Sequence, residues 1–146
     1  MTIKRRVAFA AIAIAFSGFA TSVAAESGEA FKARLSAVAA DARTRASLAG
    51  TGAVSAQLNG TKLTITGSFE GLLSPATKAE VHGAVAAGVR GPVIGALTIS
   101  KAASGTISGS IDLTPAQLTS LRKGGIYIQI HSESAPDGVL WGWLLP

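Results

Sequence analysis

The amino-acid sequence predicts an all-β domain, a sandwich or barrel of short antiparallel strands with one short helix. The chain of 146 residues is 48% hydrophobic and only 14% charged, and it contains 17 Gly. This composition excludes a disordered chain, which has low hydrophobicity and high net charge, and a coiled coil, which is rich in charge and poor in Gly. Short stretches of alternating apolar and polar residues, separated by Gly, Pro and Ser, indicate strands at the spacing of a sandwich or barrel.

The N-terminal residues have the pattern of a secretory signal peptide. Lys4, Arg5 and Arg6 precede a mainly apolar run over residues 7–20, and small residues continue to residue 25. We expect cleavage of residues 1–25, which leaves one domain over residues 26–146 in the periplasm or outside the cell, with no membrane association. An uncleaved membrane anchor is the alternative, but the run is short for the about 20 residues that span a bilayer.

The charge distribution argues against nucleic acid as a partner. Removal of residues 1–25 takes away three cations and lowers the formal net charge from +5 to +2. The remaining cations form no basic stripe of the kind that binds phosphate backbones. The chain has no Cys, so no disulfide stabilises the exported domain and core burial must hold the fold together.

Residues 26–49 allow two interpretations. Phe31, Ala33 and Leu35 alternate with polar residues as in a strand, whereas Phe31, Leu35 and Val38 also have helical spacing. We expect a short first strand followed by a polar loop, and an N-terminal linker is the alternative.

Residues 50–69 predict a β-hairpin. Apolar residues alternate on both sides of Asn59-Gly60, a dipeptide that tolerates the positive φ angles of a two-residue type I′ turn. Such a turn pairs Leu58 with Thr61 and places the apolar side chains of both strands on one face. The same residues are formally a glycosylation sequon, but the hairpin explains them better.

Five further strands are expected over residues 79–86, 93–100, 105–113, 126–132 and 139–145. A short helix separates the third of these from the fourth. Thr114 is its predicted N-cap, Pro115 takes the first helical position, Gln117 completes a capping box, and Gly124-Gly125 ends it. We expect this helix to have a structural role.

Imidazole chemistry is confined to two residues, because the chain contains only His82 and His131. No phosphate-binding loop, nucleophile elbow or zinc-protease motif occurs in the sequence. If their strands are neighbours, both histidines and Glu80, which shares a face with His82, could converge with Glu133 or Asp137 to bind Cu or Zn. The alternative is a structural role, in which each histidine bonds a backbone group or a carboxylate.

Aromatic residues near the end of the chain form a second candidate site. Trp141 and Trp143 share one face of the last strand, and Tyr127 shares a face with His131. Paired aromatic rings can bind a sugar or a peptide, and Arg90, at a loop tip, can contact an anion. Packing of the two tryptophans at the rim of the core and a solvated Arg90 are the alternatives.

Six sequence blocks, spread over most of residues 29–146, together resemble the CHRD domain family, named after the repeated domain of chordin. They are FEGLLSPAT (69–77), VHG (81–83), GPV (91–93), SGTISG (104–109), LTPAQ (113–117) and YIQIHS (127–132). The resemblance implies an extracytoplasmic, immunoglobulin-like β-sandwich or barrel, found in bacteria as a secreted single domain. The family usually has H-x-H where this chain has Glu80-Val81-His82, and Asn where it has Gln129, so both departures fall in the candidate metal site.

We therefore expect an exported, non-enzymatic binding or interaction module of the CHRD type, without a cofactor. Its expected partner is a protein or a glycan, and its expected state is a monomer or a weak oligomer. A hydrolase is disfavoured because no Ser has a predicted activating base. The alternative function is a weak Cu- or Zn-binding periplasmic protein that uses His82 and His131, with Glu80 as an oxygen ligand.

Overall fold

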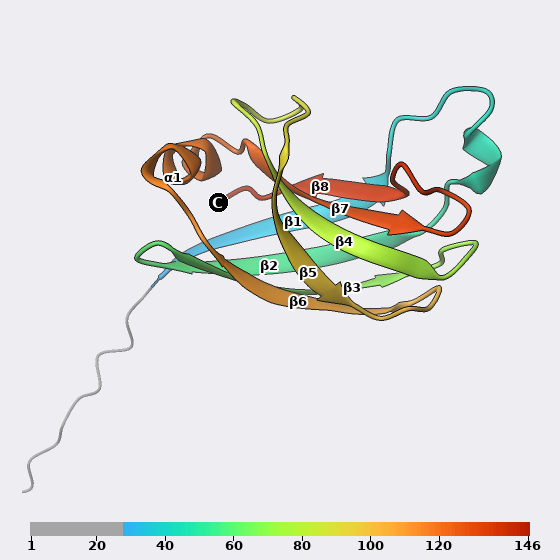
Figure 1. The fold of residues 1–146 in the computed structure, drawn as a ribbon, viewed down its shortest axis with the longest axis horizontal. Coiled ribbons are helices and arrows are strands. Elements are labelled where there is room, and N and C mark those ends of the chain that lie inside the picture. The colour runs from blue at the N-terminus through green and yellow to red at the C-terminus, as the bar shows by residue number, and fades with distance from the viewer. Residues whose placement is uncertain (1–27) are drawn as a thin grey trace, which may run out of the picture.

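The computed structural model describes residues 28–146, which form a closed antiparallel barrel of eight strands with one α-helix and one 3₁₀ turn (Figure 1). The all-β class with one short helix is therefore confirmed. The sheet closes on itself, so the immunoglobulin-like sandwich, the other arrangement implied by the family resemblance, is not confirmed. The signal peptide predicted over residues 1–25 lies outside the described residues.

In chain order the elements are β1 (Glu29–Ala37), η1 (Arg45–Ser47), β2 (Thr51–Asn59), β3 (Lys62–Glu70), β4 (Ala76–Gly83), β5 (Val93–Ile99), β6 (Gly105–Asp112), α1 (Pro115–Arg122), β7 (Ile126–Ser132) and β8 (Leu140–Trp143). Around the barrel the order is β1-β2-β3-β6-β5-β4-β7-β8, and β8 pairs back onto β1. Within residues 28–146 neither helical segment has the length and apolar character needed to cross a membrane.

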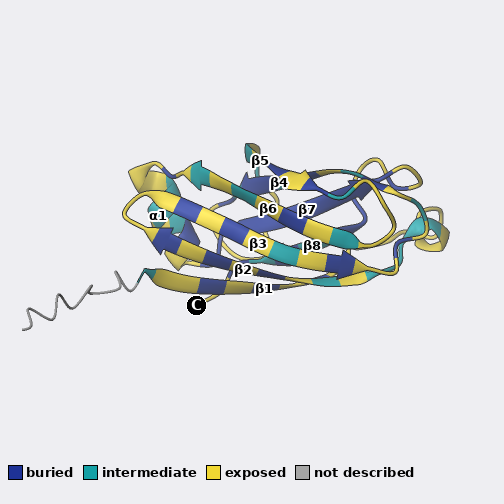
Figure 2. Cartoon of the chain, turned by 90° about the horizontal axis from the view of Figure 1, so that it is seen from below, coloured by how far each residue is buried: buried dark blue, intermediate teal, exposed yellow. Residues whose placement is uncertain are grey.

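Alternation along the strands separates an apolar interior from a polar exterior. On β2, Val54, Ala56 and Leu58 are buried while the residues between them are exposed (Figure 2). Strand β7 departs from this pattern because all seven of its residues are buried. Its outer face is therefore covered, although it carries the polar side chains of Gln129 and His131.

The β2–β3 hairpin forms where it is predicted, but in a different register. Leu58 pairs with Leu63 instead of Thr61, so the turn residues are Gly60 and Thr61. Only Gly60 has a positive φ, of +62°, as in a type II′ turn, whereas a type I′ turn needs positive φ at both central residues. The Thr61 carbonyl also accepts a hydrogen bond from the Leu113 N–H (2.8 Å). The two-residue slip keeps every side chain on its predicted face, because the side-chain period of a strand is two.

The alternating segment near the N-terminus is the strand β1, so the helical spacing in residues 31–38 is not used. Two other strands are shorter or shifted relative to the prediction. β4 begins and ends three residues earlier than residues 79–86, and beyond its end the Ala84 N–H still donates to the Gly125 carbonyl (2.8 Å), in register with β7. β8 covers only the middle of residues 139–145. The chain around residues 84–92 is thereby released to form a loop over the barrel.

Helix α1 begins with the predicted capping box. The Gln117 N–H donates to the Thr114 hydroxyl (3.3 Å), and the Thr114 N–H donates to the Gln117 side-chain carbonyl (2.9 Å). Gly124, with φ +74°, follows the last turn. The Arg122 guanidinium donates to both carboxylate oxygens of Glu29 (2.6 and 3.1 Å), which holds the end of the helix against the start of β1.

Candidate metal site

The two histidines lie on the covered outer face of neighbouring strands β4 and β7. In the antiparallel register His82 is opposite Tyr127, Glu80 is opposite Gln129, and residue 78 is opposite His131. Glu80 is therefore two residues from His82 on its own strand and diagonal to His131 across the pair, at separations that long side chains can bridge. The strands of His82 and His131 are therefore neighbours, which is the condition under which the sequence predicts that the two histidines and Glu80 converge.

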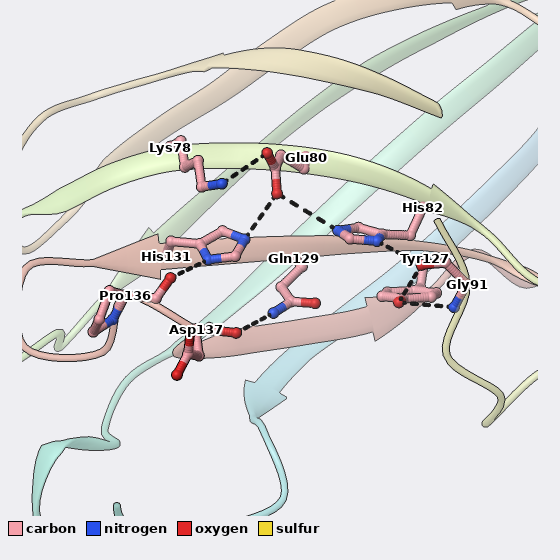
Figure 3. Close-up of polar contacts among 9 residues, drawn as sticks. All are labelled: Lys78, Glu80, His82, Gly91, Tyr127, Gln129, His131, Pro136 and Asp137. Atoms are coloured by element: carbon pink, nitrogen blue, oxygen red, sulfur yellow. Dashed lines mark hydrogen bonds and ion pairs between the residues drawn. The ribbon is translucent and has the colours of Figure 1, made fainter. Parts of the chain in front are cut away.

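A loop carbonyl holds the Nδ1 atom of each histidine. His82 Nδ1 donates to the Gly91 carbonyl (2.9 Å), and His131 Nδ1 donates to the Pro136 carbonyl (2.8 Å) (Figure 3). Because a carbonyl only accepts, each Nδ1 must carry the ring hydrogen. A neutral imidazole then has a free lone pair on Nε2. Both Nε2 atoms are buried and without a hydrogen-bond partner in the described part of the chain.

The Glu80 carboxylate lies between these two lone pairs. Its Oε2 atom is 3.0 Å from His131 Nε2 and 3.7 Å from His82 Nε2. The shorter contact is within ion-pair distance but lacks hydrogen-bond geometry. One ligand atom from each of the three residues lies within 4.8 Å of the others. Three electron-pair donors at such distances repel one another unless a positive charge, a metal ion or an added proton, lies among them.

Electrostatics keep the carboxylate ionised. Burial of Glu80 acts to raise its pKa, but the hydrogen bond from Lys78, together with the positive charges of Lys78 and of the two imidazole rings in their protonated form, outweighs burial, so the pKa is lowered from the usual value. The Lys78 ammonium donates to the other carboxylate oxygen, Oε1, at 2.9 Å. Oε2 therefore remains available to a further cation.

The two separations from Glu80 Oε2 are compatible with a tetrahedral metal ion. Bonds of about 2.0–2.1 Å to nitrogen and oxygen place ligand atoms about 3.4 Å apart in tetrahedral geometry. The observed separations from Oε2, 3.0 and 3.7 Å, lie on either side of that value. Three protein ligands leave a fourth position open, as in zinc sites that keep a water or an exogenous ligand.

The acidic residues after β7 do not join this cluster. The group formed in residues 28–146 contains Glu80 and the two histidines, without Glu133 or Asp137. Asp137 contributes only its backbone carbonyl, which accepts from Gln129 Nε2 (2.8 Å). That bond fixes the Gln129 side chain beside the site.

The predicted aromatic residues form one cluster that adjoins His82. Tyr127 stacks on the His82 ring, with centroids 4.7 Å apart, and is 5.2 Å from the Trp143 ring. Trp143 and Trp141 are 4.7 Å apart, and the Arg90 guanidinium lies 4.7 Å from the centroid of Trp141. The planes of the two tryptophan rings are inclined at 61°, and the Arg90 guanidinium covers part of Trp141.

Sequence reasoning missed the groups that support these side chains. Lys78 lies on the same strand face as Glu80, and the two-residue side-chain period of a strand was sufficient to identify it. The Gly91 and Pro136 carbonyls could not be predicted from the sequence, because every residue has a backbone carbonyl. The path of the loop determines which carbonyl reaches each histidine.

Fold and site together define a small closed barrel with two histidines and a carboxylate on a covered outer face. The chain belongs to the CHRD domain family, whose model matches residues 31–144, nearly the whole of the described domain. No match was found among curated proteins or among solved structures.

Proposed function

We propose that the protein is an exported CHRD-type binding module whose bound ligand is a transition-metal ion, Zn(II) or Cu(II), held by His82, His131 and Glu80. The observation that carries this proposal is the convergence of three possible ligand atoms while both Nδ1 atoms are already committed to carbonyls. A histidine fixed in this way presents Nε2 as a metal ligand at little additional cost in conformational entropy.

The surrounding contacts support a site built for an ion. Backbone carbonyls commonly accept the second N–H of a metal-bound histidine, and a hydrogen bond to the free oxygen of a bound carboxylate orients it. Here Gly91, Pro136 and Lys78 supply these contacts. The same chemistry favours Cu(II) over Zn(II) in affinity, because nitrogen-rich sites follow that order for divalent ions.

The proposed role is binding without catalysis. Two surface hollows, of about 810 and 710 Å³, are lined by residues other than the three ligands. His82 and His131 are themselves buried, so a bulky substrate would not reach an ion between them without displacement of the covering loops. A secreted or periplasmic ion-binding protein is consistent with the family and with the sequence pattern of residues 1–25.

Calorimetric titration of Zn(II) and Cu(II) into chelator-treated protein tests the proposal. We expect binding of one ion per chain, loss of binding in His82→Ala and His131→Ala, and strong weakening in the isosteric Glu80→Gln variant. Glu133→Gln is the matched control, because it removes an exposed carboxylate that is not in the cluster.

The titration also distinguishes a bound metal ion from a purely structural role of the two histidines. If the positive charge in the cluster is only a proton shared with Glu80, the wild-type protein will bind metal no better than the histidine variants at neutral pH. That outcome would leave the histidines as structural residues and overturn the proposal.

A further inference from the structure

A groove lies between the loop that follows β4 and the helix α1, and the three proposed metal ligands are not part of it. Its volume is about 710 Å³, which is within the range of about 300–1,000 Å³ typical of small-molecule sites. In Figure 1 the loop between β4 and β5 projects from the barrel on the same side as α1. The groove is therefore formed by two elements that both lie outside the barrel wall.

The lining of the groove is mainly apolar. Val85 and Val89 come from the loop, Ile94 from β5 and Ala116 from the helix. Val85 is 79% exposed and Val89 is 43% exposed. Exposure of neighbouring apolar side chains to water is unfavourable in free energy and is typical of binding surfaces. A ligand with a hydrocarbon chain would remove this apolar surface from water.

The charged groups that line the groove are all positive. Arg90 and Lys123 contribute to the lining, and the described residues place no Asp or Glu there. Within residues 28–146 neither cation forms an ion pair with a carboxylate. The Arg90 guanidinium instead rests over the Trp141 ring, an interaction worth less than a charge-assisted hydrogen bond.

We propose that this groove binds one fatty-acid molecule, with the acyl chain against Val85 and Val89 and the carboxylate at Arg90 and Lys123. An apolar lining with cations and no acid complements an amphiphile that has a single anionic end. The groove is open to solvent but has the volume of a small-molecule site, so we assign it one acyl chain and leave a bilayer surface as an outcome of the test. The groove shares with the proposed metal site only the supporting residue Gly91, contains none of the three ligands and does not require the metal site to be filled.

Titration of dodecanoate, below the concentration at which it forms micelles, into metal-free protein tests this site. Calorimetry measures the affinity, and tryptophan emission reports on Arg90, because both tryptophans of the chain belong to the cluster that Arg90 covers. Dodecyltrimethylammonium is the matched ligand control, with the same chain and the opposite charge. We expect saturable one-to-one binding of dodecanoate and no comparable binding of the cationic amphiphile.

Two variants and two matched controls locate the site. Lys123→Glu is expected to weaken dodecanoate binding by about tenfold or more, the scale of one lost charge-assisted hydrogen bond. Val85→Asp is expected to weaken it by about as much, because it removes an apolar contact with the acyl chain and adds a negative charge. Leu73→Asp and Lys62→Glu change an exposed apolar residue and an exposed cation outside the groove. Both controls should bind dodecanoate as the wild type does.

Three results would overturn the proposal. Equal binding of the two amphiphiles would show that no carboxylate is recognised. Cosedimentation with anionic phosphatidylglycerol vesicles, without binding of monomeric dodecanoate, would assign the valines to a membrane surface. Self-association that Val85→Asp abolishes, again without dodecanoate binding, would assign them to a second copy of the chain.

Discussion

His82 and Tyr127 lie face to face on neighbouring strands, with ring centroids 4.7 Å apart and ring planes within 11° of parallel. The same two side chains meet at Gly91, whose carbonyl accepts from His82 Nδ1 (2.9 Å) and from the Tyr127 hydroxyl (3.3 Å). The Gly91 N–H donates to the Tyr127 oxygen (3.2 Å). Stacking and hydrogen bonding together fix the plane of the imidazole and the direction of its Nε2 atom.

Two substitutions of Tyr127 should separate the contribution of ring stacking to stability from that of the hydroxyl group. Tyr127→Phe keeps the ring and loses the bonds to Gly91, so we expect a loss of about 1 kcal/mol in the free energy of unfolding. Tyr127→Ala removes a fully buried ring and should cost about 3–5 kcal/mol. Urea denaturation measures both values, and similar losses in the two variants would show that the ring contributes little.

Metal binding should stabilise the fold. An ion that binds only the folded state at a free concentration one hundred times its dissociation constant adds about 2.7 kcal/mol to the free energy of unfolding. We expect Zn(II) to raise the melting temperature of the wild type and of Glu133→Gln, but not of His131→Ala. A rise of the same size in His131→Ala would place the stabilising ion elsewhere.

Stability without metal should depend on Glu80 in the acid range. The pKa of Glu80 is lowered from its usual value of 4.5 despite the opposing effect of burial, chiefly through the Lys78 hydrogen bond and the nearby imidazoles. The ionised carboxylate therefore stabilises the folded state above that value, and this contribution is lost as the pH falls through the lowered folded-state pKa. The difference in unfolding free energy between the wild type and Glu80→Gln should shrink on acidification, as urea titrations at successive pH values will show. A difference that stays constant would mean that the charge of Glu80 does not contribute.

The helix cap offers a prediction that is independent of the site. Thr114→Ala removes one half of the capping box and should lower the free energy of unfolding by about 1 kcal/mol. Thr114→Ser retains the hydroxyl and should be nearly neutral. Equal stability of the Ala and Ser variants in chemical denaturation would contradict the role of the cap.

Two glycines with positive φ form a matched pair. Gly88 (φ +81°) has open space where a Cβ atom would be, whereas a Cβ at Gly138 (φ +127°) would clash with Gln129 Nε2. Gly88→Ala should therefore cost only the backbone strain of about 1–2 kcal/mol. Gly138→Ala should cost more, because it also displaces the Gln129 side chain that bonds the Asp137 carbonyl. Thermal denaturation of the two variants tests the order.

The sequence predicted the faces of the strands better than their partners. A period of two determines that His82 and His131 point away from the barrel interior, whatever the pairing, and even the slipped β2–β3 register preserves every face. Alternation is the same in a sandwich and in a barrel, so the pattern did not distinguish the two folds. The barrel closes because β1 pairs with β8, where Ser36 lies opposite Trp141, and this pairing joins the two ends of the domain.

The convergence of Glu80, His82 and His131 was predictable from the sequence, whereas the groups that support these side chains were not. Histidine is scarce in this chain, so few combinations of ligands were available and Glu80 followed from its place two residues before His82. The covering loops have no periodicity, and the approach of Gly91 to His82 depends on where the loop after β4 returns to the barrel. The convergence of Arg90 on Trp141 has the same origin.

The pairing of β1 with β8 also sets the order in which the polypeptide can mature. β1 is made before the other strands and finds its second partner only when the last residues of the domain have been made. Until then one edge of β1 and one edge of β7 stay open, and such edges invite pairing with other chains. Contacts between distant parts of a chain also form slowly. Closure of the ring by β8 is therefore the step that removes both open edges.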